Sequence, residues 1–463
     1  MKEKGKKNSL LWKLIVASLF LVSIVLVVLL IVGNPGNEAP AASEPATSET
    51  EETTLPPTEP TEPTEPTQPP VLKEESFTLS AVGDILMHKP VINTGYKSST
   101  KSYNFDSIFT YFSQYVQSAD LAVGNLETTL AGTNNGYAYA GYPNFNCPDA
   151  IVDGMKNAGF DVILTANNHS YDTRGVGITR TVQVIRDRGV GYLGTKATAE
   201  EPNFIIEERN GIKLGLACYT YENDARPDVK APNSHTMSSK YAPLINTFDY
   251  TNLNLFYDEI AASMAQAKEQ GADAFVLFIH WGQEYKTKQN STQTKIAQKL
   301  CDLGVDVIIG GHPHVVQPVE LLTSTVDSTK KTVCLYSMGN AVSNQRLGNI
   351  SSVKTAHTED GVLFSVTFRR YSDGTVILES AKCIPTWVNK RTNPNTGGTE
   401  YNILPLDKEI SDWKGTFALT NKTLENCNAS YKRTMDIVSA GMKTVNDYLT
   451  ANQIAVEESL GVK

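Results

Sequence analysis

The segment VDVIIGGHPH, residues 305–314, is an apolar run that stops abruptly at two glycines and two histidines. A short apolar run with such an end predicts a buried strand that leads into a loop. Open α/β sheets bind their ligands at the carboxyl ends of their strands. We therefore expect His312 and His314 to lie at a sheet edge. Two imidazoles supply only part of a metal shell, so the function depends on the rest of the chain.

Similar apolar runs alternate with helical patterns between residues 77 and 387. We expect strands at 77–82, 121–123, 162–164, 191–193, 204–208, 214–218, 274–279, 305–309 and 332–336. We expect helices at 148–158, 179–188, 251–269 and 292–303. This alternation predicts βαβ units and a largely parallel sheet, which is an α/β fold.

Two hairpins interrupt the alternation. Asn210-Gly211 lies between two alternating apolar runs, which is a strong hairpin signal. A second turn at 371–374 joins the runs 362–369 and 375–381. The sheet is therefore expected to be mixed, and two stacked sheets are consistent with the pattern.

The N-terminal residues resemble a membrane anchor. Residues 10–32 are nearly all apolar, with Lys13 as the only charged residue. A helix of about 20 such residues spans a bilayer, and the basic head at 1–9 indicates a cytoplasmic N-terminus. We expect an uncleaved single-pass signal anchor in the cell membrane, with the main domain extracellular. A cleaved signal peptide is the alternative, but its apolar region usually runs only about 7–15 residues.

The segments on either side of the main domain have different compositions. Residues 33–76 are rich in Pro, Thr and Glu, which predicts a disordered, extended spacer. We place the main domain at 77–387. The amphipathic pattern at about 424–449 predicts one or two peripheral helices in the C-terminal extension 388–463. A partner-binding module is the alternative for this extension.

Charge and cysteine content exclude some classes of function. The net charge of −9 falls mainly on the acidic spacer, so the main domain is close to neutral. No basic face is indicated, and we do not expect a nucleic-acid partner. The six cysteines include no Cys-x-x-Cys pair, and we predict no disulfide from their spacing.

Polar motifs directly follow six of the predicted strands, at positions that parallel strands bring to one sheet edge. Their carboxylates, carboxamides and imidazoles suit hard or borderline divalent cations. They contribute Asp84, Glu127, Asn168, His280, His312 and His314, with Asn125 as a spare ligand. This is too many for one tetrahedral ion, and it fits two ions about 3.5–4 Å apart that share a carboxylate. No thiolate joins the set, and we expect His88, His235 and His357, which lack such motifs, to be structural.

The order of these motifs resembles a known family. They read Gly-Asp at 83–84, Asn-Leu-Glu at 125–127, Asn-Asn-His at 167–169, His-Trp-Gly-x-Glu at 280–284, Gly-His-Pro-His at 311–314 and Ser-Met-Gly-Asn at 337–340. The chain resembles the CapA family of poly-γ-glutamate capsule proteins, in the calcineurin-like metallophosphatase superfamily, over about residues 77–387. The resemblance implies a four-layer α/β/β/α sandwich with two divalent metal ions (Mn, Fe or Zn) at the sheet edge.

The resemblance also assigns roles to residues. Asp84 matches the first-motif metal ligand, Glu127 the bridging carboxylate and Asn168 a further ligand. His169 is expected to face the substrate as a catalytic group. His280, His312 and His314 match the remaining ligands, and Asn125, Glu284 and Asn340 are additional site residues.

Two departures from the family pattern weaken this comparison. Leu86 stands where phosphatases of the superfamily usually carry the histidine of Asp-x-His, and the second motif reads Asn-Leu-Glu in place of Gly-Asp. His88 is the wrong step along a strand to replace that histidine without a bulge. One metal ion is therefore expected to bind more weakly, and ordinary phosphomonoesterase activity is in doubt.

The resemblance implies a role in synthesis, export or anchoring of a poly-γ-glutamate-type capsule polymer. In one interpretation the chain is a metal-dependent, phosphoesterase-like hydrolase. In the alternative it is a non-catalytic metal- or polymer-binding subunit of a membrane polymer-synthesis complex. The expected partners are the lipid bilayer, membrane subunits of a polyglutamate synthase and an anionic polymer.

Overall fold

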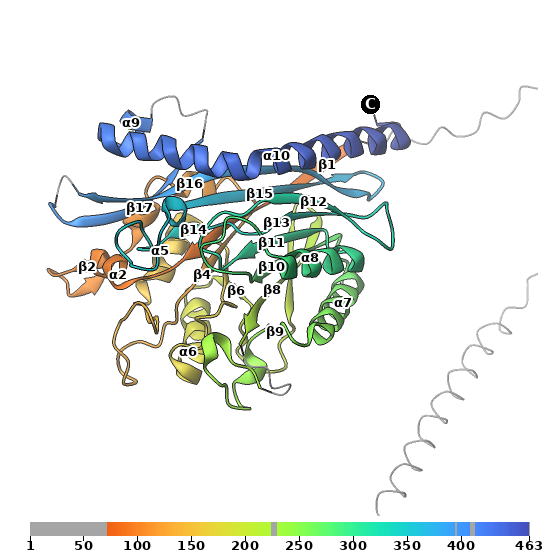
Figure 1. Cartoon of the computed structure of the whole chain (residues 1–463). Helices are drawn as coiled ribbons and strands as arrows, with labels where there is room; N and C mark the ends of the chain where they lie inside the picture. The colour runs from red at the N-terminus through yellow and green to blue at the C-terminus, as the bar shows by residue number, and fades with distance from the viewer. Residues whose placement is uncertain (1–71, 224–228, 394–395, 408–412, 463) are drawn as a thin grey trace, which may run out of the picture. The chain divides into compact units, whose positions relative to one another are not determined.

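The computed structural model describes residues 72–223, 229–393, 396–407 and 413–462 (Figure 1). The predicted head at 1–9, the anchor at 10–32 and the spacer up to residue 71 lie outside these ranges. Among the described helices, none has both the length and the apolar composition needed to cross a bilayer.

Two mixed β-sheets form the centre of the domain. The first has the order β17-β16-β15-β1-β4-β5-β6, with β14 paired to β1. The strands β1, β4, β5, β6 and β14 are parallel, and β15 to β17 are antiparallel additions. The strands of this sheet are β1 (Lys73–Ile85), β4 (Leu121–Leu126), β5 (Val162–Leu164), β6 (Gly191–Leu193), β14 (Asn340–Val342), β15 (Asp360–Tyr371), β16 (Val376–Thr392) and β17 (Thr399–Pro405).

The second sheet has the order β12-β13-β11-β10-β8-β7, with β9 paired to β8. Its inner strands β13, β11, β10 and β8 are parallel, and the edge strands β12 and β7 are antiparallel. The strands are β7 (Phe204–Arg209), β8 (Ile212–Glu222), β9 (Thr247–Asp249), β10 (Ala274–His280), β11 (Val307–Gly311), β12 (Val319–Thr323) and β13 (Lys331–Leu335).

The two sheets face each other across one apolar core. Leu79 and Val123 of the first sheet belong to the same buried cluster as Val276 and Ile309 of the second. The outer face of each sheet carries a separate buried cluster with its own helices. This arrangement confirms the mixed α/β fold and the stacking of two sheets, because each sheet has two apolar faces to cover.

Helices cover the outer face of each sheet. On the first are α2 (Lys89–Gly95), α3 (Asp106–Phe109), α4 (Ser113–Val116), α5 (Ala150–Ala158) and α6 (Arg174–Asp187). On the second are α7 (Leu253–Glu269) and α8 (Ser291–Leu303). A small hairpin, β2 (Tyr96–Lys97) and β3 (Ser102–Tyr103), follows α2, and single turns occur at η1 (Pro232–Ser234), η2 (Ala242–Leu244) and η3 (Ala356–Glu359).

The sequence located most of these elements. All nine predicted strands are present, and 162–164 and 191–193 match β5 and β6 at both ends. The Asn210-Gly211 and 371–374 hairpins are confirmed. Helix α8 illustrates the local reason, since Asn290 and Gln293 form a reciprocal capping box before it and Gly304 ends it at a φ of 97°. Helix α6 begins five residues earlier than predicted.

The C-terminal region differs from the expected extension. Strand β16 runs through residue 387, where we placed the end of the domain, and β17 adds a further strand to the same sheet. Beyond them lie α9 (Trp413–Thr416) and one continuous helix, α10 (Asn421–Leu460). Figure 1 shows α10 lying along β15 and β16. Its residues Val438 and Val445 belong to the core between the sheets, so α10 is part of the folded domain.

The cysteines contribute to packing. In the described ranges all six are unpaired, and five of them are buried. A buried free thiol acts as a small apolar side chain.

Candidate metal centre

The motif residues converge because the parallel strands that carry them end side by side. Asp84 on β1 is in register with Asn125 on β4 and with Asn340 on β14. In the second sheet His280, the last residue of β10, is in register with Gly311 of β11. The two sheets bring these ends together from opposite sides, so the site lies between them.

Gly310 and Gly311 allow close packing around the site. A Cβ atom on Gly311 would lie 3.1 Å from Oδ1 of Asp84, and one on Gly310 would lie 2.0 Å from the Tyr336 carbonyl oxygen. The following histidines adopt positive φ angles of 96° at His312 and 56° at His314. Such conformations are strained for residues other than glycine, and they cluster at functional sites. In this conformation His314 reaches Asp84 and Glu127 of the first sheet.

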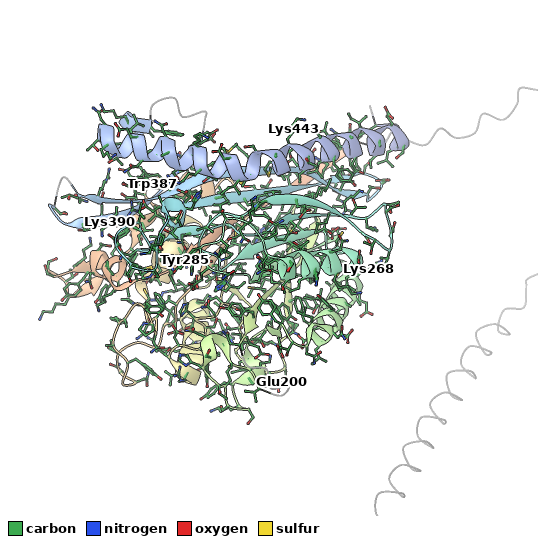
Figure 2. The ribbon with its side chains drawn as sticks, in the orientation of Figure 1. Glu200, Lys268, Tyr285, Trp387, Lys390 and Lys443 are labelled. Carbon is green, nitrogen blue, oxygen red and sulfur yellow. The ribbon has the colours of Figure 1, made fainter. Side chains whose placement is uncertain are left out.

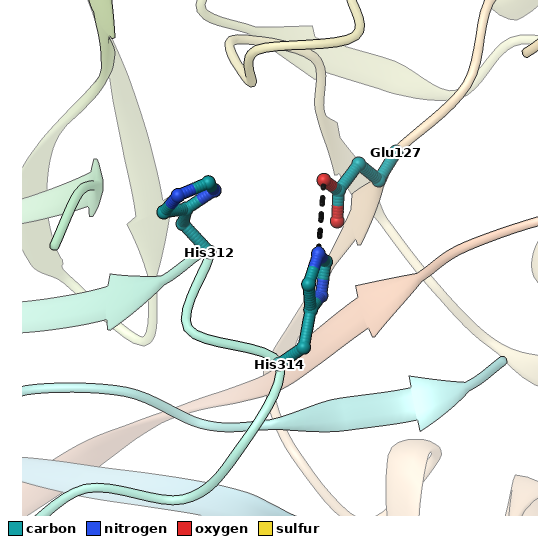
Figure 3. Close-up of side chains that lie close together, drawn as sticks. All are labelled: Glu127, His312 and His314. Carbon is teal, nitrogen blue, oxygen red and sulfur yellow. Dashed lines mark ion pairs between the residues drawn. The ribbon is translucent and has the colours of Figure 1, made fainter. Parts of the chain in front are cut away.

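Glu127 is the central residue of the site. Its side chain is fully buried, and among the described residues neither carboxylate oxygen accepts a hydrogen bond. One ligand atom from each of Glu127, His312 and His314 lies within 4.8 Å of the other two (Figure 3). A buried carboxylate without donors costs several kcal/mol, and a cation bound between these side chains would remove that cost. The residues therefore fit a metal ion.

One group of donors surrounds Glu127 on the side of the second sheet. His280 Nε2 lies 2.8 Å from Asn168 Oδ1 and 3.5 Å from Glu127 Oε1. The ring of His312 lies 4.9 Å from that of His280, and its Nδ1 has no hydrogen-bond partner in the described part of the chain. Ligand atoms about 2.1 Å from one ion are about 3 Å apart. These spacings suit one divalent ion held by the side chains of Glu127, Asn168, His280 and His312.

A second group lies on the side of the first sheet and shares Glu127. His314 Nδ1 is 3.1 Å from Asp84 Oδ2, and His314 Nε2 is 3.8 Å from Glu127 Oε1. The usual fourth position of this group belongs to Leu86, which is buried and apolar. The second group thus offers three side chains where the first offers four.

The electrostatics of the site favour a cation. Burial alone would lower the pKa of His314, but the Glu127 and Asp84 carboxylates outweigh burial and raise that pKa to about 10. Burial and the neighbouring His280 and His314 imidazoles lower the pKa of His312 well below its usual value. His312 is therefore neutral, as a metal ligand must be. The negative potential that holds a proton on His314 also attracts a divalent ion.

Neighbouring side chains fix the orientation of these donors. Asn125 donates to Asp84 Oδ1 at 2.7 Å, so this spare ligand holds another ligand in place. The Asn340 amide donates to the carbonyl oxygens of Thr358 and His314, and its Oδ1 lies 3.1 Å from His314 Nδ1. Tyr221 Oη lies 3.3 Å from His312 Nε2, which leaves Nδ1 facing the site. Such contacts set the tautomer and ring orientation of ligating histidines.

His169 forms a dyad with Asp172 beside the donor groups. Its Nδ1 lies 2.7 Å from Asp172 Oδ2, which also accepts the backbone N–H of Phe145 at 2.7 Å. Burial would lower the pKa of His169, but the hydrogen bond and charge of Asp172 raise it above its usual value. The contact leaves Nε2 as the nitrogen available to a substrate.

An open cavity of about 650 Å³ gives access to the site. Its walls include Asn168, His169 and His314 on the inner side, and Tyr142, Glu284 and Tyr285 toward the rim. Tyr142 is 79% exposed, and Glu284 is also exposed. A cavity of this size accepts a ligand as large as a typical drug molecule.

The structure brings all six predicted ligands and His169 together. Glu284 is exposed and lines the same cavity, and its charge contributes to the raised pKa of His314. Tyr221, which contacts His312, was not predicted as a site residue, because the sequence carries no signal for it. Asp172 was given no role, although it follows His169 by only three residues.

His88, which we expected to be structural, lies beyond the end of β1 and beside the cavity. Strand β1 ends at Ile85 after a register shift at Asp84, so the alternation of a strand does not apply at position 88. His88 lines the same cavity, and its Nδ1 faces the backbone N–H of Asn344 at 3.3 Å. Burial and the charge of His314 lower its pKa to about 4. His235 and His357 line no part of this cavity.

Comparisons with known proteins agree with these motifs. The family model described as "Bacterial capsule synthesis protein PGA_cap" matches residues 78–345, more than half of the chain. The capsule biosynthesis protein CapA of Bacillus anthracis is 27% identical over 313 residues, covering 66% of this chain and 67% of that protein. The PGA biosynthesis protein CapA of Bacillus subtilis (strain 168) is 27% identical over 274 residues, covering 59% of this chain and 64% of that protein. The chain thus spans about two thirds of the length of these relatives.

Among solved structures, a Staphylococcus aureus protein assigned as a 5'-nucleotidase, in complex with α-ketoglutarate, covers 77% of this chain and 58% of that chain. Its TM-score is 0.40 and its sequence identity 11%, which is too distant to inform the site. The extent of the family match, over the strands and loops that carry the donors, decides the family. The chain belongs to the bacterial capsule synthesis protein family PGA_cap.

Proposed function

We propose that this chain acts in the synthesis, export or anchoring of a poly-γ-glutamate-type capsule polymer, through a metal-dependent hydrolytic site. The single observation that carries the proposal is Glu127, whose buried carboxylate has no donor in the described residues and faces three imidazoles. A structural role would leave this charge uncompensated. The motif order and the two CapA relatives support the capsule polymer as substrate.

The fold we propose is the four-layer metallophosphatase type, with two divalent ions of Mn, Fe or Zn. Bound there, the ions would act as Lewis acids and stabilise charge that develops on the substrate. Glu127, Asn168, His280 and His312 would hold the first ion, and Asp84, Glu127 and His314 the second. Asymmetry between the two groups predicts that the second ion binds more weakly.

His169 would transfer the proton. Asp172 holds its Nδ1, so Nε2 can donate to a leaving group or to a developing anion at the cavity. The edge of Phe145 contacts the His169 ring, with centroids 4.6 Å apart, and limits its rotation. Both contacts keep the imidazole in one orientation, which general acid catalysis requires.

The absence of a histidine at position 86 favours a second candidate. Leu86 gives the first-sheet group an apolar neighbour, as expected if one ion is no longer needed for turnover. In that case the chain is a metal- or polymer-binding subunit of a membrane polymer-synthesis complex. In both candidates we propose that residues 10–32 anchor the chain in the cell membrane, with the domain outside.

The test uses the full-length protein purified in detergent. Metal content is measured by mass spectrometry, alongside hydrolysis of phosphomonoester, phosphodiester and γ-glutamyl polymer substrates. The controls are His280→Ala and Glu127→Ala, which should lose metal and turnover together. Stoichiometric metal without turnover on any substrate would contradict the hydrolase and favour the subunit. Absence of metal after Mn²⁺ or Zn²⁺ is supplied would contradict the hydrolase and the metal site, and would leave only a polymer-binding subunit.

A further inference from the structure

A second groove of about 640 Å³ lies beside the cavity of the metal centre. Its walls come from α2, from the β2–β3 hairpin and from β16 and β17 at one end of the domain (Figure 1). The charged groups of this groove are Lys97 and Lys390, and no carboxylate is among the described residues that line it. Most other lining residues are small and polar: Asn93, Thr94, Ser98, Ser99, Thr396 and Thr399.

The groove and the cavity adjoin. Pro90 lines both of them. Asn344, on the cavity side, accepts a hydrogen bond from Lys390 Nζ at 3.4 Å, while Lys390 itself lines the groove. Figure 2 shows Lys390 near that end of the domain and Tyr285 close to its centre. A ligand can therefore extend from the metal centre past Pro90 into the groove.

The lysines of this path are available to a ligand. The side chain of Lys97 is exposed and has no ion pair or hydrogen bond to any part of the chain that the structure describes. Within the same residues, the Lys390 ammonium contacts only neutral partners, the Asn344 amide and the Tyr401 ring at 5.6 Å. Lys89, at the cavity end, donates to the Tyr139 carbonyl oxygen. Three positive charges thus follow one path without paired carboxylates.

We infer that the groove is a binding subsite for the distal part of an extended polyanionic substrate whose reacting bond lies at the metal centre. A ligand pocket of about 300–1,000 Å³ already accepts a drug-sized molecule, so two adjoining volumes exceed what one small phosphoester needs. A chain with a carboxylate on each residue would pair successively with Lys89, Lys390 and Lys97. This inference rests on the proposed function. It adds where the polymer would lie and which positive charges would bind it.

The test compares binding of a γ-linked glutamate dipeptide and a long poly-γ-glutamate chain to the full-length, metal-loaded protein, by fluorescence anisotropy at low salt. The test variant is Lys97→Gln/Lys390→Gln. The matched control is Lys295→Gln/Lys299→Gln, which removes two exposed lysines of α8 outside the groove. We expect the wild type and the control to prefer the long chain, and the test variant to lose roughly tenfold of that preference, equivalent to about 1.4 kcal/mol.

The outcomes separate the two proposals. Equal preference for the long chain in the test variant and the wild type would overturn the groove assignment. Tighter binding of a polyphosphate than of poly-γ-glutamate would overturn its assignment to a carboxylate chain. A lysine-dependent preference in protein that binds no metal would contradict the proposed function and leave the groove standing.

Discussion

His280 Nε2 lies 3.5 Å from Glu127 Oε1, although His280 ends a strand of the second sheet and Glu127 follows a strand of the first. The candidate metal centre thus joins the two sheets through side chains. Because neither Glu127 oxygen accepts a hydrogen bond from the described residues, the free energy of unfolding should depend on what occupies this space. This relationship leads to the first prediction.

Removal of metal should destabilise the wild type but not Glu127→Gln. A ligand that binds only the folded state, at 100 times its Kd, stabilises it by about 2.7 kcal/mol. We expect chelation to lower the wild-type melting temperature measured by calorimetry. Glu127→Gln removes the buried charge, so the melting temperature of this variant should not change when chelator is added. It should equal or exceed the melting temperature of the metal-free wild type. A chelator response in the variant that matches the wild type would contradict a role for Glu127 as ligand.

Leu86→His should increase binding of the second ion. The substitution places an imidazole beside the three-residue group of Asp84, Glu127 and His314, and imidazole suits the divalent ions proposed. Mass spectrometry after dialysis should show close to two ions per chain in the variant and close to one in the wild type. Leu86→Met is the volume-matched control, since its thioether is a poor ligand for hard ions. Equal metal content in wild type and Leu86→His would show that the missing histidine does not limit the site.

Asp172→Asn should reduce turnover without loss of metal. Within the described residues, the Asp172 carboxylate forms hydrogen bonds with His169, the Phe145 backbone and Asn233 and with none of the proposed ligands, so it positions the proton-transfer group. On the substrate identified by the hydrolysis assay, we expect kcat to fall by roughly 100-fold, with KM and metal content retained. Loss of metal in this variant would instead indicate that Asp172 supports the centre as a whole.

The buried pair of Asp360 and Arg433 should control the pH dependence of stability. Arg433 on α10 contacts both carboxylate oxygens of Asp360 on β15, and Ser430 donates to one of them. Burial nevertheless raises the pKa of Asp360 to about 6. A carboxyl whose folded pKa exceeds its unfolded value of about 3.9 favours folding most below pH 4, and this contribution is lost as the pH rises through 6.

Arg433→Met should therefore be more destabilising at pH 8 than at pH 5. At pH 8 it leaves an unpaired buried carboxylate, which costs about 3–5 kcal/mol. At pH 5 that carboxyl can take up a proton. Urea unfolding at the two pH values measures the difference. Lys432→Met, an exposed neighbour paired only with Asp436, is the control. An equal loss at both pH values would contradict the burial of this charge.

Gly441→Ala should destabilise the domain, against the usual helix preference. Within a helix this change normally stabilises by about 1 kcal/mol. At Gly441 of α10 an added Cβ would lie 1.9 Å from the Val319 carbonyl oxygen of β12. Repositioning the helix should cost about 1–3 kcal/mol. The control is Ala440→Gly at the exposed neighbouring position, which should lower the free energy of unfolding only by the difference in helix preference between the two residues. A higher stability of Gly441→Ala would show that α10 is not packed this closely.

Local sequence patterns were sufficient to predict most strands and the residue types of the site. Strand-terminating motifs identified the six proposed ligands and His169, because a polar residue directly after a buried strand must lie at the sheet edge. The same alternation located β5, β6 and the two hairpins, whose turn residues impose their geometry locally.

Only the tertiary structure decided how those residues combine. Glu127 lacks donors because two sheets, far apart in the sequence, close over it, and no pattern within either sheet predicts that. Tyr221 and His88 reach the site through register and loop geometry, and neither belongs to a motif. Strand β17 was likewise missed, since its pairing depends on the neighbouring sheet edge. The amphipathic pattern at about 424–449 predicted a helix but not its contact with the core between the sheets. Local preference fixes which elements form, whereas packing between distant segments fixes which side chains lose water and which acquire partners.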